Sequence, residues 1–309
     1  MRGTESPGQS PGFRKDPMNK RTAAITAAVL LLALLLPVAS MLLLQQYLPP
    51  VYGESYYAAL QDKYAALSAS DDLPGGRILL IGGSGTAFSV DGALLEEETG
   101  IPAVNFALYA AFGSQYMMEL ARDHIREGDL VILCPELSTQ TLSMYFGADA
   151  ALQASEGDLS LLLQARFRDY PALAAEFPGY IQKKFSFLLP KRSTGPAPEG
   201  VYARASFDEK GNMIFERQEN RMPYGYLPDA LPVVSKDAYE EDFLDYLCKY
   251  ADDAAKKGAE VYYAFPFMNA LSLSGVSDRA IAELEEFLLT RLTFPMLSSL
   301  SSRILSAVW

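Results

Sequence analysis

Residues 77–88 read RILLIGGSGTAF. The apolar run at 78–81 leads directly into the small residues GGSGT at 82–86. A short apolar run that ends in glycine is typical of a parallel strand buried on both faces. The small residues let the backbone turn sharply at the carboxyl end of that strand, where open α/β sheets place their ligands. The stretch therefore predicts a strand, a tight turn and an exposed Ser84, with a plain solvated turn as the alternative.

The rest of the chain repeats this alternation of strands and helices. We expect further strands at 101–106, 130–134, 260–265 and 292–297. We expect helices at 91–98, 114–126, 239–257 and 278–291. Such an order predicts an α/β protein with a doubly wound parallel sheet, a flavodoxin-like three-layer fold.

The amino-acid composition excludes several classes of protein function. The chain has 309 residues, 50% of them hydrophobic, and a formal net charge of -12. This suits one sizeable α/β domain, and the absence of a basic run in the body of the chain argues against nucleic acid as a partner. The two cysteines, Cys134 and Cys248, are too few for a metal framework and are expected to be buried free thiols. We expect no metal and no cofactor.

The amino terminus predicts a membrane anchor. We interpret 1–21, which is polar and ends in basic residues, as a disordered cytoplasmic tail, and the apolar run at 22–45 as a transmembrane helix. The basic residues place the amino terminus in the cytoplasm and the rest of the chain outside it. The alternative is a signal peptide cleaved near Ala39, but the apolar run continues to Leu44, which favours an uncleaved anchor.

The segment 46–76 is expected to form a stalk with a helix at its centre. The domain itself is expected to cover 77–309. Within it, the looser pattern at about 138–237 is interpreted as a lid-like insertion over the active face, with a hairpin around 208–212.

Three motifs together resemble a known family. They are GGSGTAF at 82–88, VNFALYAAFG at 104–113 and GDLVILCPE at 128–136. In this order and spacing they resemble the first blocks of the SGNH (GDSL-like) hydrolases. The resemblance covers about 77–297 and is closest to the membrane-anchored extracytoplasmic branch, which includes alginate-type O-acetyltransferases and lipoteichoic-acid D-alanylation proteins.

The resemblance implies a role for particular residues. Ser84 matches the nucleophile, and the backbone N–H groups of Ser84, Gly85 and Ala110 match the oxyanion hole. Asn105, Glu136 and Asn269 would line the site. The family has asparagine where this chain has Glu136, and an ionised carboxylate cannot donate a hydrogen bond to a developing oxyanion.

The catalytic base is the larger departure. The family places aspartate and histidine together near the carboxyl terminus, whereas here the chain reads SSLSSRILSAVW after residue 297. The single histidine, His124, falls near the far end of a predicted helix and is expected to be an ordinary helix-end residue rather than the base. We expect either a truncated or frame-shifted reading of a longer gene, or a pseudo-enzyme.

Two functions follow as hypotheses. The first is a membrane-anchored esterase or O-acyltransferase that acts on acyl groups of cell-envelope polymers or acylated glycans, inactive as this chain stands. A membrane acyl-carrier protein is left open as a further partner. The second is a non-catalytic scaffold in which the glycine turn at 82–86 and Asn269 bind a glycan or a partner protein. Five aromatic residues of the looser region would suit stacking on a sugar, with plain packing as the alternative: Tyr202, Phe207, Phe215, Tyr224 and Tyr226. Phosphate or nucleotide binding at 82–86 is a weaker idea, because no lysine follows the glycines.

Overall fold

The computed structural model describes residues 20–188, 200–216, 231–297 and 304–305. The chain divides into two compact units, Met1–Leu44 and Gln45–Trp309. Helix α1 (Lys20–Tyr47) begins in the first unit and ends in the second. Judged on the described residues, none of the helices is both long enough and apolar enough to cross a membrane.

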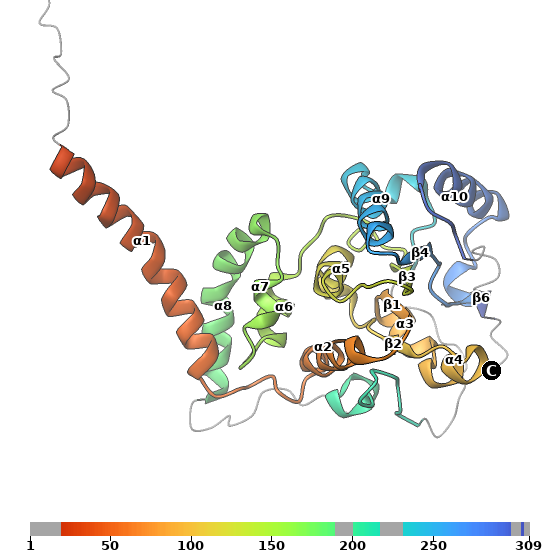
Figure 1. Cartoon of the computed structure of the whole chain (residues 1–309), viewed down its shortest axis with the longest axis horizontal. Coiled ribbons are helices and arrows are strands. Elements are labelled where there is room, and N and C mark those ends of the chain that lie inside the picture. Colours follow the sequence, from red (N-terminus) through yellow and green to blue (C-terminus); the bar gives the residue numbers. More distant parts are fainter. Residues whose placement is uncertain (1–19, 189–199, 217–230, 298–303, 306–309) are drawn as a thin grey trace, which may run out of the picture. The chain divides into compact units, whose positions relative to one another are not determined.

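The second unit contains the remaining elements (Figure 1). Its strands are β1 (Ile78–Gly82), β2 (Ala103–Asn105), β3 (Leu130–Cys134), β4 (Glu260–Tyr263), β5 (Met268–Asn269) and β6 (Ile304–Leu305). Its α-helices are α2 (Ala59–Ala69), α3 (Ser84–Ser89), α4 (Gly92–Thr99), α5 (Ser114–Arg122), α6 (Ala148–Ala154), α7 (Ser160–Leu163), α8 (Tyr170–Leu188), α9 (Glu241–Lys256) and α10 (Asp278–Arg291).

Four strands form an all-parallel sheet in the order β2-β1-β3-β4. The predicted α/β class with a parallel sheet is thereby confirmed. The strand expected at 292–297 is reduced to a single parallel bridge between Tyr263 and Met296, which places this segment beside β4. The short strands β5 and β6 pair separately from the main sheet.

Helices cover both faces of the sheet. On one face, Ile78 and Leu80 of β1 pack with Leu95 of α4. Alternate residues of a strand point to opposite faces, so Ile81 faces the other side, where it lies close to side chains of α5 and α9. Figure 1 shows the strands between α5 and α9 on one side and α4 on the other. This buries all five residues of β1, as its unbroken apolar pattern predicts.

The segment expected as a stalk packs against the sheet domain. It contains the 3-10 helix η1 (Tyr56–Ala58) and α2. The Tyr56 hydroxyl donates a hydrogen bond to the Leu108 carbonyl (3.0 Å), and Lys63 Nζ donates one to the Asn105 carbonyl (2.9 Å). Both partners follow or end β2, so this segment covers the carboxyl end of that strand.

The region expected as a lid-like insertion is described in parts. Helices α6, α7 and α8 lie in it, and α6 packs against α8 and against η1. Residues 200–216 form short turns, including an antiparallel bridge between Phe207 and Met213 at the expected hairpin. Residues 189–199 and 217–230 lie outside the described residues.

Candidate functional site

Ser84 lies at the first position of α3, immediately after the turn that ends β1. The turn needs glycine because neighbouring atoms approach it closely. A Cβ at Gly82 would lie 2.4 Å from the carbonyl oxygen of Cys134, and one at Gly83 would lie 2.6 Å from the Glu136 side chain. The Cys134 carbonyl belongs to the backbone of β3, so position 82 excludes a side chain. A side chain at position 83 would instead displace the Glu136 carboxylate.

Glu136 is the direct partner of Ser84. Its Oε1 accepts a hydrogen bond from Ser84 Oγ at 2.7 Å and another from the Gly85 backbone N–H at 2.8 Å. The register of the sheet explains this contact, since Gly82 pairs with Cys134 and the two strands therefore end side by side. One carboxylate oxygen thus occupies both the hydroxyl and the N–H donor at the start of α3.

The loop that carries Glu136 is itself fixed by hydrogen bonds. The Thr141 hydroxyl donates to the Glu136 carbonyl oxygen, and the Leu142 N–H donates to the carbonyl of Ser138 (3.0 Å). These hydrogen bonds fix the turn that carries Glu136, and with it the position of the carboxylate. Negative charge at a helix amino terminus is stabilised by the partial positive charge of the free N–H groups, and hydrogen bonds to an ionised acceptor are stronger than neutral ones.

This arrangement has two chemical consequences. A carboxylate within hydrogen-bond distance of a serine hydroxyl is placed to accept its proton, which is the geometric condition for a general base. The same oxygen also takes up the Gly85 N–H, and it would repel an oxyanion formed beside it. The contact with Glu136 therefore stabilises the Ser84 hydroxyl in its present position and disfavours the oxyanion that acyl transfer would form.

Asn105 and Ala110 follow β2 but serve other contacts. The buried Asn105 amide donates to the Val90 carbonyl (3.1 Å) and accepts from the Ala107 N–H (3.2 Å). Ala110 is the first residue of the 3-10 helix η3 (Ala110–Phe112). In the described part of the chain, no hydrogen bond joins either residue to Ser84 or Glu136.

The loop after β4 adjoins the site. A Cβ at Gly85 would lie 3.5 Å from Pro266 Cβ and 3.8 Å from the Phe267 carbonyl oxygen. Asn269 comes two residues later, in β5, and its side chain lies outside the described residues.

His124 lies at the opposite end of the strands, near the start of β1. Its Nδ1 is 2.6 Å from an Asp71 carboxylate oxygen, and its carbonyl oxygen accepts a hydrogen bond from the Arg77 guanidinium. Arg77 directly precedes β1, whereas Ser84 follows it. At roughly 3.3 Å per strand residue, the two ends of β1 lie about 15 Å apart. His124 is therefore not placed to act on Ser84, as its position in the sequence indicates.

An aromatic cluster lies beside the site, and three of its five residues were not singled out in the sequence. The ring of Tyr56 is surrounded by those of Phe88, Tyr109, Tyr202 and Phe207 at centroid distances of 5.6 to 5.8 Å. We call these five residues the Tyr56 cluster. Phe88 belongs to α3, and Tyr109 precedes Ala110. Burial raises the pKa of Tyr56, and the charge of Glu136 raises it further.

The Tyr56 cluster includes two of the aromatic residues expected to stack on a ligand. Phe207 is buried, while Tyr202 is 51% exposed and can offer a ring face. Phe215 is 42% exposed. Tyr224 and Tyr226 lie outside the described residues.

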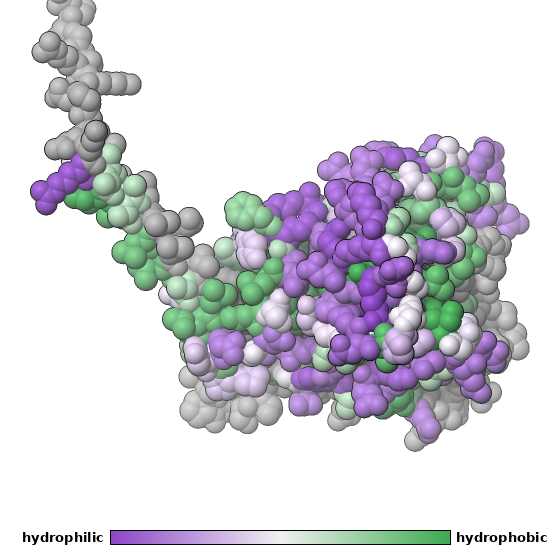
Figure 2. Space-filling view, in the orientation of Figure 1, coloured by the Kyte–Doolittle hydropathy of each residue, from purple (hydrophilic) through white to green (hydrophobic). Residues whose placement is uncertain are grey.

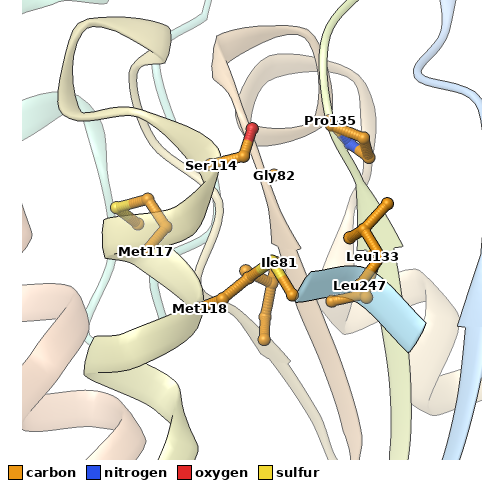
Figure 3. A pocket seen from close by; sticks show the side chains of 8 residues that line it. All are labelled: Ile81, Gly82, Ser114, Met117, Met118, Leu133, Pro135 and Leu247. Carbon is orange, nitrogen blue, oxygen red and sulfur yellow. The ribbon is translucent and has the colours of Figure 1, made fainter. Parts of the chain in front are cut away.

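A small cavity lies beneath the strand ends (Figure 3). It has a volume of about 10 Å³, which is room for roughly one water molecule. Its lining is mostly apolar and comes from β1, β3 and the residue that follows β3, α5 and α9: Ile81, Gly82, Ser114, Met117, Met118, Leu133, Pro135 and Leu247. This cavity is too small to hold an acyl chain.

Within the described residues, no group of three histidine, cysteine, aspartate or glutamate side chains is arranged to hold a metal ion. Neither cysteine forms a disulfide; Cys134 is buried as expected, whereas Cys248 is only half-buried. Comparison of the chain with protein-family models, with curated proteins and with solved structures returned no match in any of the three.

Proposed function

We propose that this chain is a membrane-anchored, extracytoplasmic SGNH-like domain whose serine site binds acylated cell-envelope polymers or glycans without hydrolysing them. Binding of a sugar is supported by the ring of Tyr202, which is 51% exposed and lies in the Tyr56 cluster beside the site. The absence of hydrolysis is supported by the double hydrogen bond that Glu136 Oε1 accepts from Ser84 Oγ and the Gly85 N–H. It occupies two groups that an esterase would use for attack and for oxyanion binding.

The chemistry of serine supports a silent site. Serine is a weak nucleophile and depends on a neighbouring base, usually histidine. The one histidine of these 309 residues contacts Asp71 at the other end of β1. Loss of the base from a serine triad lowers turnover by several orders of magnitude.

The sheet order supports the finer fold proposal. A flavodoxin-like sheet has the order 2-1-3-4-5. The order β2-β1-β3-β4 agrees with its first four strands, and the bridge from Tyr263 to Met296 lies at the position of the fifth.

The anchor rests on the apolar run at 22–45. Within it, α1 exposes large aliphatic side chains, each more than half exposed: Ile25, Val29, Leu32, Leu36 and Leu43. Burial of such side chains in a lipid phase would stabilise the helix there, and the basic residues before it would keep the amino terminus in the cytoplasm.

A second function is favoured by the 2.7 Å contact itself. Glu136 could act as the base for Ser84, which would make the chain a slow esterase or O-acyltransferase. A carboxylate is a weaker base than imidazole at neutral pH, so its catalysis would be correspondingly weaker.

Hydrolysis of a p-nitrophenyl ester separates the two functions. We expect the wild-type chain and Ser84→Ala to give equal rates without a burst of product. Ser89→Ala, which changes an exposed serine of the same helix, is the matched control. A burst that disappears in both Ser84→Ala and Glu136→Gln, but persists in Ser89→Ala, would establish the second function. Titration with an O-acetylated glycan and its deacetylated form, in the wild type and in Tyr202→Ala, checks the binding half.

A further inference from the structure

The Ser84 site offers a ligand hydrogen-bond acceptors rather than donors. The Ser84 hydroxyl and the Gly85 N–H both donate to Glu136 Oε1, at 2.7 and 2.8 Å. The second carboxylate oxygen, Glu136 Oε2, accepts no hydrogen bond from the described residues. An ionised carboxylate only accepts hydrogen bonds. A group that binds beside Ser84 must therefore bring its own donors.

The space beside Gly85 is bounded by two acceptor oxygens from different loops. A Cβ at Gly85 would lie 3.8 Å from Glu136 Oε1, 3.8 Å from the Phe267 carbonyl oxygen and 3.5 Å from Pro266 Cβ. These are ordinary van der Waals distances, so one further atom fits there without displacing its neighbours. An N–H donor in this space meets two acceptors, whereas an acyl carbonyl or a carboxylate meets only their lone pairs.

The charge of Glu136 has no counter-charge from the protein. None of the lysine, arginine or histidine side chains that the structure describes forms an ion pair with it, although the carboxylate is half-buried. The buried Glu156, by contrast, pairs with Lys184 at 2.7 Å. A carboxylate that is partly removed from water is stabilised by a nearby cation. The site therefore favours a ligand that is itself positively charged.

Aromatic rings lie one helical turn from Ser84. Phe88 follows Ser84 by four residues in α3, which places both on the same side of the helix. The Phe88 ring contacts those of Tyr56 and Tyr202, at 5.7 and 5.8 Å between centroids. Burial raises the pKa of Tyr56 and the charge of Glu136 raises it further, so the carboxylate acts on these rings electrostatically. Ring faces attract organic cations, and aromatic side chains form sites for ammonium ligands.

We propose that the Ser84 site binds the primary ammonium group of a glycan, which is an amino sugar whose nitrogen carries no acyl group. The ammonium donates to Glu136 and to the Phe267 carbonyl, and the attached sugar ring packs against the exposed face of Tyr202. This inference rests on the proposed glycan binding and narrows it, because the polymer must carry free amino groups beside its acyl groups.

The negative charge of the whole chain is the other source of attraction for a cation. The formal net charge is -12, and Figure 2 shows a mostly hydrophilic surface over α5 and α9. Asp252 is an exposed carboxylate of α9. Attraction to the surface as a whole does not depend on one particular carboxylate. Asp252→Asn, which removes the same charge as Glu136→Gln, is therefore its matched control.

The test titrates the full chain, in nonionic detergent with EDTA, with two related sugars. One is the β-linked disaccharide of N-acetylglucosamine, and the other is the same disaccharide with one amino group free. Ligand-observed NMR gives the Kd of each. We expect the wild type and Asp252→Asn to bind the free amine about tenfold more tightly than the acetylated sugar, and Glu136→Gln to bind the two about equally. EDTA keeps divalent cations away from the carboxylate.

The outcomes separate this inference from the proposed function. If the wild type binds the O-acetylated glycan but prefers neither disaccharide, the ammonium site is wrong and glycan binding stands. If none of the three sugars binds, both proposals fail. If Asp252→Asn loses the preference as fully as Glu136→Gln, the preference belongs to the general charge of the chain and the ammonium site is again wrong. The wild-type comparison needs no variant, and circular dichroism checks that Glu136→Gln is folded.

Discussion

Replacing Lys184 by methionine is expected to lower the free energy of unfolding by about 3–5 kcal/mol, since it leaves a buried carboxylate without its counter-charge. Lys184 Nζ lies 2.7 Å from Glu156 Oε1, and the two side chains are 0% and 2% exposed. The Tyr180 hydroxyl donates to the same oxygen at 2.7 Å. The other oxygen of Glu156 accepts from the backbone N–H groups of Val51 and Tyr52 at 2.6 and 2.8 Å.

The adjacent lysine is the matched control for this prediction. The Lys183 side chain is 56% exposed and lies 3.3 Å from Asp149, so Lys183→Met should change stability by less than about 0.5 kcal/mol. Adding Glu156→Gln to Lys184→Met should recover part of the loss, because it removes the unpaired charge. Urea unfolding followed by near-ultraviolet circular dichroism measures all four proteins. Equal stability of the two lysine variants would contradict the prediction.

The second large effect is a dependence of stability on pH through Lys63. Its side chain is fully buried, and burial lowers its pKa to about 7, with the charge of Asp208 acting in the opposite direction. Nζ donates to the carbonyls of Asn105 (2.9 Å) and Gly211 (2.6 Å) and lies 4.3 Å from the centroid of the Phe207 ring. A neutral amine has two N–H groups, which these two carbonyls satisfy.

The direction follows from the proton bound in each state. In the unfolded chain a lysine keeps its proton up to about pH 10.4, whereas folded Lys63 loses it near pH 7. Between these values the unfolded state binds more protons, so the free energy of unfolding rises with pH, by up to about 1.4 kcal/mol per pH unit. The stability contributed by this group is complete above the unfolded pKa and is lost as pH falls toward 7.

Urea unfolding of the wild type and Lys63→Met from pH 7 to pH 9.5 checks this prediction. The difference in free energy between the two proteins should shift by about 2–3 kcal/mol in favour of the wild type over that range. Lys210→Met is the control, because the Lys210 side chain is 53% exposed and pairs with Glu96 at the surface. Parallel pH curves for wild type and Lys63→Met would show that the carbonyls and the ring hold Lys63 as a cation.

The site was predictable from the sequence only as far as its backbone. The run at 78–86 predicts the end of β1, the turn and Ser84 at its far side, because these features depend on residues adjacent in the chain. The sequence marks Glu136 as an unexpected residue at the edge of the site. Its hydrogen bond to the Ser84 hydroxyl depends on the register of β1 with β3, which no local pattern encodes.

The residues around the site show more strongly what the sequence alone cannot predict. The segment around Tyr56 and Lys63 has a helical pattern, which predicts a stalk. In the structure, Tyr56 lies in the centre of the Tyr56 cluster and Lys63 is fully buried beneath the turn at Gly211. A lysine in an amphipathic helix is ordinarily solvated, so only the partner that covers it reveals its burial.

The sequence by itself determined the α/β class, the alternation of the four main strands with helices, and a serine at the carboxyl end of the first strand, because periodicity and glycine act over a few residues. The tertiary structure alone decided the chemical state of that serine. Ser84 and Glu136 are 52 residues apart and meet through the pairing of two parallel strands. Contacts between distant segments decide what the Ser84 hydroxyl faces. It could face a base, an open oxyanion hole or, as here, a carboxylate that accepts hydrogen bonds from the hydroxyl and from the Gly85 N–H.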